Sequence, residues 1–177
     1  MTEPGCDLLR RFVHGDASAF ETLFREFSPE VYRWIVRIVR DRAAADDALV
    51  ETFWRAHRSR ARFDPSRSFG AWMRRIATHA AVDQLKQARR EPWIPSADDR
   101  LPASPAADPD VSRIISTALA SLPPKLHIVA VLALVEEQPY ADIADALGIP
   151  IGTVKSRVFR ATRALREELI RAGVRQQ

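Results

Sequence analysis

The chain has 177 residues, 46% of them apolar, and its 27 basic and 23 acidic side chains give a formal net charge of +4. This composition is typical of a folded protein, and the length allows one large domain or two small ones. The longest apolar run, residues 128–135, is too short to span a membrane, and the N-terminus lacks a signal-peptide pattern. With a single cysteine, Cys6, no internal disulfide can form, and we expect a cytoplasmic protein without a membrane partner.

The first half of the chain has the periodicity of α-helices. Over residues 31–39, apolar side chains recur at i, i+3, i+4, i+7 and i+8, which predicts a helix with one apolar face. Further helices are predicted over 45–57 and over about 69–89, the last with Trp72, Ile76 and Ala80 along its apolar stripe. Three tryptophans are expected in the core: Trp34, Trp54 and Trp72. No useful stretch alternates polar and apolar residues, so the predicted fold class is all-α.

Positive charge is concentrated in two segments. Residues 55–90 hold ten basic side chains against two acidic ones, and residues 153–175 hold seven against two. Between them, residues 92–111 hold one basic and four acidic side chains. Two basic segments around an acidic spacer favour two contacts with one polyanion, although charge alone leaves open that both are solvated helix faces.

The acidic spacer also divides the chain. Five of the twelve prolines fall within residues 92–111, where a helix would be interrupted and little apolar surface is available for a core. Because a long structureless loop is unusual inside one compact domain, we predict a linker at 92–111. The predicted domains are two small helical bundles, at residues 1–91 and 112–177.

Residues 140–160 have the layout of a helix-turn-helix. Gly148 can adopt the left-handed conformation that ends a first helix, and Pro150 suits the start of a second. On the second helix the apolar stripe is Ile151, Val154, Val158, Ala161 and Leu165. The other faces carry short polar groups and cations, which suit base edges and phosphates in a DNA groove. These candidate DNA contacts are Thr153, Lys155, Ser156, Arg157, Phe159, Arg160 and Arg163.

These motifs resemble those of extracytoplasmic-function sigma factors, which are two-domain members of the sigma-70 family. Residues 142–165 closely resemble the fourth characteristic region of that family, and residues 119–125 resemble the segment that precedes it. In the first half, residues 45–47, 51–53, 68–73 and 76–77, and then Asp83, match the second characteristic region in order and spacing. The resemblance covers residues 16–169 and implies a transcription initiation factor.

The resemblance implies three contacts. Asp47 and Glu51 lie on the acidic helix that docks on the β′ clamp helices of core RNA polymerase, and the family also contacts the β flap. The second helix of the helix-turn-helix reads the minus-thirty-five promoter element. The loop and the helix that follow residue 62 capture flipped bases of the minus-ten element. The candidate residues for that capture are Arg62, Phe63, Arg67, Trp72, Arg74, Arg75 and His79. An anti-sigma factor is a further candidate partner.

The chain departs from the usual family pattern at several positions. Val50 replaces the common Gln, His79 replaces Asn, and His127 replaces Arg. An imidazole does not present the paired donor and acceptor of an amide, so the identity of the base read at position 79 is open.

Two other functions remain as alternatives. The first is a free-standing helix-turn-helix regulator that binds palindromic operators as a dimer. The second is a small metal-dependent hydrolase that uses Asp46, Asp47, His57 or His79, although adjacent carboxylates on a helix point about 100° apart. No Ser-His-Asp or Cys-His arrangement stands out, so we expect no enzyme activity, no cofactor and no metal.

Overall fold

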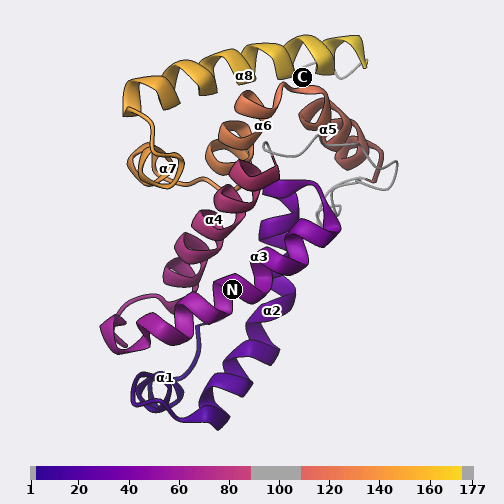
Figure 1. Ribbon diagram of the computed structural model, residues 1–177. Coiled ribbons are helices and arrows are strands. Elements are labelled where there is room, and N and C mark those ends of the chain that lie inside the picture. Colours follow the sequence, from indigo (N-terminus) through magenta and orange to yellow (C-terminus); the bar gives the residue numbers. More distant parts are fainter. Residues whose placement is uncertain (1–2, 89–108, 173–177) are drawn as a thin grey trace. The chain divides into compact units, whose positions relative to one another are not determined.

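The computed structural model describes residues 3–88 and 109–172, and they fall into two compact units, within 1–99 and 100–177. Every regular element in these described ranges is helical, which confirms the predicted all-α class (Figure 1). Unit 1 contains α1 (Cys6–Val13), α2 (Ala17–Val39), α3 (Arg42–Ser59), the short 3-10 turn η1 (Arg60–Arg62) and α4 (Phe69–Ala88). The predicted helices therefore lie inside α2, α3 and, apart from residue 89, α4.

Local sequence sets where the helices of unit 1 begin. Asp16 caps α2, because its Oδ1 accepts hydrogen bonds from the backbone N–H of Ser18 at 2.8 Å and of Ala19 at 3.2 Å. Asp41 caps α3 in the same way through the N–H of Ala44, at 2.7 Å. In Figure 1, α3 and α4 run beside each other and both pack on α2.

The core of unit 1 is rich in aromatic side chains. The Phe69 ring meets Phe12, Phe27 and Phe63 edge to face, at centroid distances of 5.1–5.9 Å. The buried stripe of α4 repeats every four residues, at Phe69, Met73, Ala77 and Ala81. Of the predicted stripe, Ala80 is buried, whereas Trp72 and Ile76 are only half-buried, so the prediction was off by about one position at these two residues.

The tryptophans differ from one another in their surroundings. Trp34 is buried as predicted, and its Nε1–H donates to Thr78 Oγ1 at 3.1 Å. Trp54 contradicts the prediction, since 55% of it is exposed. The reason is geometric: Phe53 and Ala56 face the core from α3, and Trp54 lies about 100° from Phe53 and about 160° from Ala56 around the helix, so it points outward.

The described part of unit 2, residues 109–172, contains five consecutive helical elements. They are α5 (Pro109–Ser121), α6 (Pro124–Ala130), the π-helical turn η2 (Val131–Val135), α7 (Tyr140–Leu147) and α8 (Ile151–Arg171). α5 begins at Pro109, so the last three residues of the predicted linker are helical. Residues 92–108 of that linker lie outside the described residues.

The core of unit 2 centres on the apolar run of α6 and η2. Residues 128–132 are buried, whereas Leu134 and Val135 are exposed because the helix changes to a π-turn and ends. α8 packs on α6, and α7 packs on η2 and α8; Ile143 of α7 and Val154 of α8 are fully buried. His127 belongs to the same core: it is 2% exposed, and its Nδ1 lies 2.9 Å from the carbonyl oxygen of Leu119.

Candidate nucleic-acid interface

The predicted helix-turn-helix is present as α7 and α8. Gly148 closes α7 at φ +63°, a left-handed conformation that costs glycine little, and Ile149 N–H returns to the Ala144 carbonyl oxygen at 3.1 Å. Pro150 is the N-cap residue of α8, and its φ of −59° already suits the helix that starts at Ile151. The turn therefore follows from residues adjacent in sequence.

α8 separates an apolar face from a cationic one. Val154, Val158 and Ala161 are buried, as predicted, whereas Ile151 is exposed because it precedes the first turn that reaches the core. Lys155, Ser156 and Arg160 are exposed, and the Phe159 ring is 71% exposed. Thr153 and Arg157 are half-buried at the edges of this face, and Arg163 pairs with Glu167 at 3.2 Å. A convex helix with exposed cations and an exposed ring has the shape of a major-groove reader.

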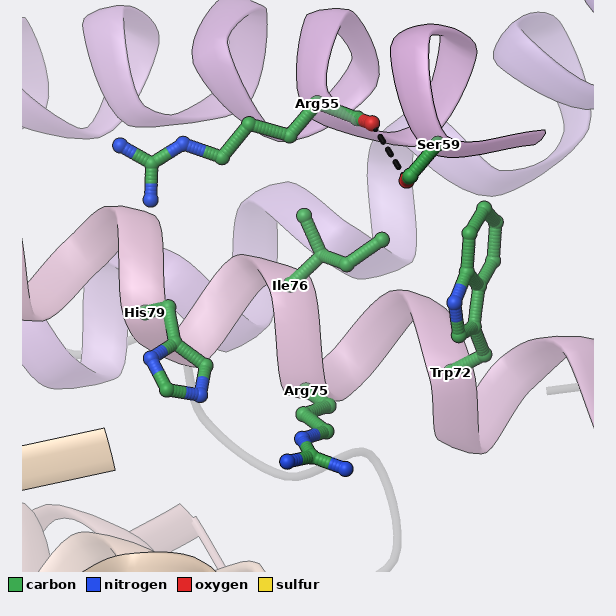
Figure 2. Close-up of a pocket in the computed structure, with 6 residues that line it drawn as sticks. All are labelled: Arg55, Ser59, Trp72, Arg75, Ile76 and His79. Carbon is green, nitrogen blue, oxygen red and sulfur yellow. Dashed lines mark hydrogen bonds between the residues drawn. The ribbon is translucent and has the colours of Figure 1, made fainter. Parts of the chain in front are cut away.

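Unit 1 has a concave feature instead, between α3 and α4. A pocket of about 360 Å³, the α3–α4 pocket, is lined by Arg55, Ser59, Trp72, Arg75, Ile76 and His79. In Figure 2, Arg55 and Ser59 reach it from α3 and the other four side chains come from α4. Trp72 and Ile76 supply apolar surface, and the cations supply positive charge. Such a lining suits a flat, negatively charged group such as an unstacked nucleotide.

Arg55 is held at this pocket by two carboxylates. Its Nε donates to Glu51 Oε1 at 2.6 Å, and its Nη1 donates to Asp83 Oδ2 of α4 at 2.9 Å. Partial burial by itself would lower the pKa of Arg55, but these two hydrogen bonds outweigh it and raise the pKa. The guanidinium is therefore a permanent cation that links the two helices.

The loop before α4 is organised by acidic side chains. Asp64 accepts hydrogen bonds from the N–H and the hydroxyl of Ser66, at 2.9 and 2.7 Å, which lower the pKa of Asp64. At the start of α4, Glu3 accepts from Ser68 Oγ at 2.5 Å, from Phe69 N–H at 2.9 Å and from Gly70 N–H at 3.3 Å. A residue from the other end of the unit thus caps the helix that lines the pocket.

Not every predicted minus-ten residue lies at the pocket. Trp72, Arg75 and His79 line it, and Arg62 and Arg67 are exposed on the preceding segment. Phe63 is 5% exposed and packs on Trp72 at a centroid distance of 4.7 Å, so it supports the pocket wall from inside the core. Arg74 points away from the pocket, because successive helical residues such as Arg74 and Arg75 point about 100° apart. Its guanidinium lies 5.5 Å from the centre of the Trp34 ring.

α3 presents a further exposed surface, which we call the outer face of α3. Asp46, Asp47, Val50 and Trp54 lie within about 100° of one another around the helix, and all four are exposed. Val50 and Trp54 are 67% and 55% exposed and lie one helical turn apart, so they form a small apolar patch on this face. Glu51 lies at the edge of this face, between it and Arg55. A partly apolar, partly acidic surface is suited to a protein partner with cations.

Comparison with known proteins assigns both units to one family. Residues 23–91 match the family model for sigma-70 region 2, and residues 112–165 match the model for sigma-70 region 4. The RNA polymerase sigma factor CarQ of Myxococcus xanthus is 36% identical over 165 residues, which cover 91% of this chain and 95% of the relative. The chain belongs to the extracytoplasmic-function sigma factors of the sigma-70 family.

Other members show the same correspondence along most of this sigma factor. The ECF RNA polymerase sigma factor SigW of Bacillus subtilis is 28% identical and covers 91% of this chain and 94% of the relative. The sigma factor RpoE from Bartonella quintana, solved in complex with the anti-sigma factor NepR, shares the fold at a TM-score of 0.64 and 23% identity. That alignment covers 85% of this chain and 96% of RpoE.

Family membership confirms the predicted function as a transcription initiation factor, and it rejects the free-standing regulator. Sigma factors are DNA-binding initiation factors, so the family gives no support to a metal-dependent hydrolase. Within the described ranges, no three His, Cys, Asp or Glu side chains form a group able to hold a metal ion. None of the helices in those ranges is long and apolar enough to cross a membrane.

Sequence reasoning missed several residues of this interface. Arg55 and Ser59 line the α3–α4 pocket, and Val50 and Trp54 make the outer face of α3 partly apolar. The helical periodicity of residues 45–57 contained a signal for Trp54, because Phe53 and Ala56 already occupied the inward positions. No local signal marks Glu3, because the three residues that donate hydrogen bonds to it lie 65 to 67 positions further along the chain.

Proposed function

We propose that this sigma factor binds core RNA polymerase through unit 1 and contacts two promoter elements, one with each unit. The observation that carries the proposal is the cationic face of α8, where Lys155, Ser156 and Arg160 are exposed opposite a buried apolar stripe. In this proposal the polymerase catalyses RNA synthesis, and the chain itself has no enzyme activity. Its place of action is the cytoplasm, where bacterial polymerase and chromosome meet.

In unit 2, α8 would enter the major groove of the minus-thirty-five element. Arg160 and Ser156 are placed to reach base edges, and Lys155 and the half-buried Arg157 to reach phosphates. The exposed Phe159 ring would contact an apolar group such as a thymine methyl. α8 would thus read an intact duplex, with α7 holding it in place.

In unit 1, the α3–α4 pocket would hold a base flipped out of the non-template strand. Trp72 offers a stacking surface, His79 offers a polar ring edge, and Arg75 offers a cation for the backbone. Arg62 and Arg67 on the preceding segment would contact neighbouring phosphates. Capturing an extruded base stabilises the melted strand, which would assist promoter opening.

The outer face of α3 would form the contact with polymerase. Asp47 and Glu51 supply negative charge, and Val50 and Trp54 supply apolar area at the centre of the patch. The Trp54→Ala variant should weaken core-polymerase binding in a titration. The matched control is Ile170→Ala, which removes a similarly exposed apolar side chain from α8.

The functional test is transcription in vitro with the cognate core polymerase. DNA bound by the assembled holoenzyme is sequenced first, and the enriched fragments are then used as templates. We expect transcripts that require both the sigma factor and these fragments. If the chain bound DNA tightly by itself but no fragment needed it for transcription, the proposal would be wrong.

We also propose a protein antagonist of this sigma factor. The support is the shared fold with RpoE, which was solved with the anti-sigma factor NepR. A protein that co-purifies with the tagged chain and, once purified, inhibits transcription in vitro would meet this expectation. A captured protein without inhibitory activity would not.

A further inference from the structure

One side chain belongs to two functional surfaces of unit 1. Arg55 lines the α3–α4 pocket, and its Nε also holds Glu51, which lies at the edge of the outer face of α3. Asp83 of α4 holds the other side of the same guanidinium. Figure 2 shows Arg55 and Ser59 reaching the pocket from α3. Arg55 therefore lies between the surface proposed for polymerase and the pocket proposed for a base.

The two ion pairs of Arg55 are well placed to exchange partners. The side chains of Arg55, Glu51 and Asp83 are 36%, 42% and 46% exposed, so water competes for all three. Ion pairs at this exposure contribute little to stability, and replacing one anion by another costs little. A guanidinium has five donors in a planar fork, so it can keep Asp83 on one edge while it binds a phosphate with another.

We propose that Arg55 is a positioning residue that makes capture of the melted strand depend on polymerase binding. In the free chain, Glu51 takes the Nε–H of Arg55, so that edge of the guanidinium is not available to a phosphate in the pocket. When a cation of the polymerase binds Glu51, the attraction between Glu51 and Arg55 weakens. Asp83 keeps the guanidinium near the pocket, where it binds a phosphate of the single strand. This inference rests on the proposed roles of the outer face of α3 and of the pocket.

The first experiment imitates the neutralised carboxylate without polymerase. The probe is a fluorescent single-stranded DNA dodecamer selected from a random pool on the unmodified chain, and affinity is measured by anisotropy. Glu51→Gln should tighten binding by about two- to fivefold, the range expected for releasing one exposed ion pair. Asp47→Asn, on the same helix, removes the same charge without touching Arg55 and should have a smaller effect.

The double variant separates release of Arg55 from general charge. In an Arg55→Gln background, Glu51→Gln should no longer tighten strand binding. Arg55→Lys keeps the charge and serves as a second background, because an ammonium lacks the planar fork that holds Asp83 and a phosphate together. If Glu51→Gln tightened binding equally in all backgrounds, the effect would be general electrostatics and the inference would be wrong.

The second experiment compares the free chain with the holoenzyme. Arg55→Gln should weaken strand binding by about tenfold when the cognate core polymerase is saturating, as expected for a charge-assisted hydrogen bond. In the free chain the same change should lower the affinity for single-stranded DNA by less than about twofold, since the ion pair to Glu51 keeps that edge of the guanidinium from binding a phosphate. A purely structural role would give equal losses in both states, and equal losses would overturn the inference.

These measurements separate this inference from the proposed function. If the unmodified chain bound no single-stranded DNA in either state, both would be wrong. If strand binding were present and fell on substitution of His79, but did not respond to Glu51 or Arg55 as stated, the pocket would stand. Only the coupling through Arg55 would then be rejected.

Discussion

Arg55 of unit 1 lies between two carboxylates at a pocket, whereas Lys155 and Arg160 of unit 2 extend from an exposed helix face. Both sets of cations suit a polyanion, but their surroundings differ. The pocket has apolar surface from Trp72 and Ile76, and it can receive a base only after the base leaves the stack. α8 is convex, and it fits the groove of a duplex that remains paired.

The two surfaces have the same sign of charge, so charge alone predicted a polyanion but not whether it is single-stranded or double-stranded. In the proposed roles, a concave and a convex surface with the same sign of charge would select single-stranded and double-stranded DNA by shape. The aromatic residues show this most directly. Phe69 is 1% exposed in the core beneath the pocket, whereas Phe159 is 71% exposed on α8. If the two units read different forms of DNA, damage to one should leave the other working.

The largest expected effect is that of Phe69→Ala. Removing this ring from among Phe12, Phe27 and Phe63 should destabilise unit 1 by about 3–5 kcal/mol, because the buried cavity cannot collapse fully. Urea denaturation followed by tryptophan fluorescence measures this, since all four tryptophans lie within residues 1–99. Single-strand binding should be lost, and binding of a duplex minus-thirty-five site should persist.

Phe159→Ala is the matched control for that experiment. It removes an identical ring from an exposed position of unit 2, so the urea midpoint followed by circular dichroism, which also reports the helices of unit 2, should stay unchanged while duplex binding weakens. If Phe69→Ala abolished duplex binding as well as strand binding while unit 2 remained helical, the two units would not bind DNA independently.

The structure also shows which features a sequence can predict. Helix positions and the helix-turn-helix follow from neighbours three or four residues apart: the apolar side chains predicted over residues 31–39 are buried in α2, and Val154, Val158 and Ala161 of the predicted stripe are buried in α8. The exposure of Trp54 was within reach of the same periodicity. By contrast, the burial of Phe63 depends on the ring of Trp72, and the bridge at Arg55 depends on Asp83. Such contacts join positions that the linear sequence does not relate.

Arg160→Ala gives the next largest effect and tests the reading of an intact duplex. Loss of a bidentate contact to guanine should cost about 1–3 kcal/mol and relax sequence preference at one position. Binding to a library of duplexes, with sequencing of the bound fraction, measures both. Arg171→Ala is the control, because Arg171 is exposed on the same helix but about 16 Å further along its axis. An unchanged preference in the Arg160 variant would remove this residue from the reader's role.

Salt dependence distinguishes phosphate contacts from base contacts on the same helix. Lys155→Ala should reduce the slope of log affinity against log salt by about 1, because one phosphate contact and its released counterion are lost. Phe159→Ala should weaken binding without changing the slope, since its ring carries no charge. Titrations of duplex binding at several salt concentrations would show either pattern. Equal slopes for the Lys155 variant and the unmodified chain would contradict a phosphate contact.

The smallest effect concerns how the two DNA-facing helices begin. α4 is capped by Glu3, from 65–67 residues earlier in the chain, whereas α8 starts at Ile151 and its N-cap residue, Pro150, makes no side-chain cap hydrogen bond. Partial burial alone would raise the pKa of Glu3, but hydrogen bonds from Ser68, Phe69 and Gly70 outweigh it and lower the pKa below its usual 4.5. Glu3→Gln should therefore destabilise unit 1 at neutral pH, by about 0.3–1 kcal/mol because Glu3 is exposed.

The pH dependence of this loss identifies its cause. A carboxyl with a lowered pKa in the folded state stabilises the protein above its unfolded pKa, near 4.5, and the contribution disappears as the pH falls through the folded value. The difference in unfolding free energy between Glu3→Gln and the unmodified chain should therefore be full at pH 7 and shrink below about pH 4.5. Glu26→Gln, an exposed change within α2, should show little difference at either pH. A loss at Glu3 that stayed constant from pH 7 to pH 3 would mean that shape, and not charge at the α4 terminus, holds the loop in place.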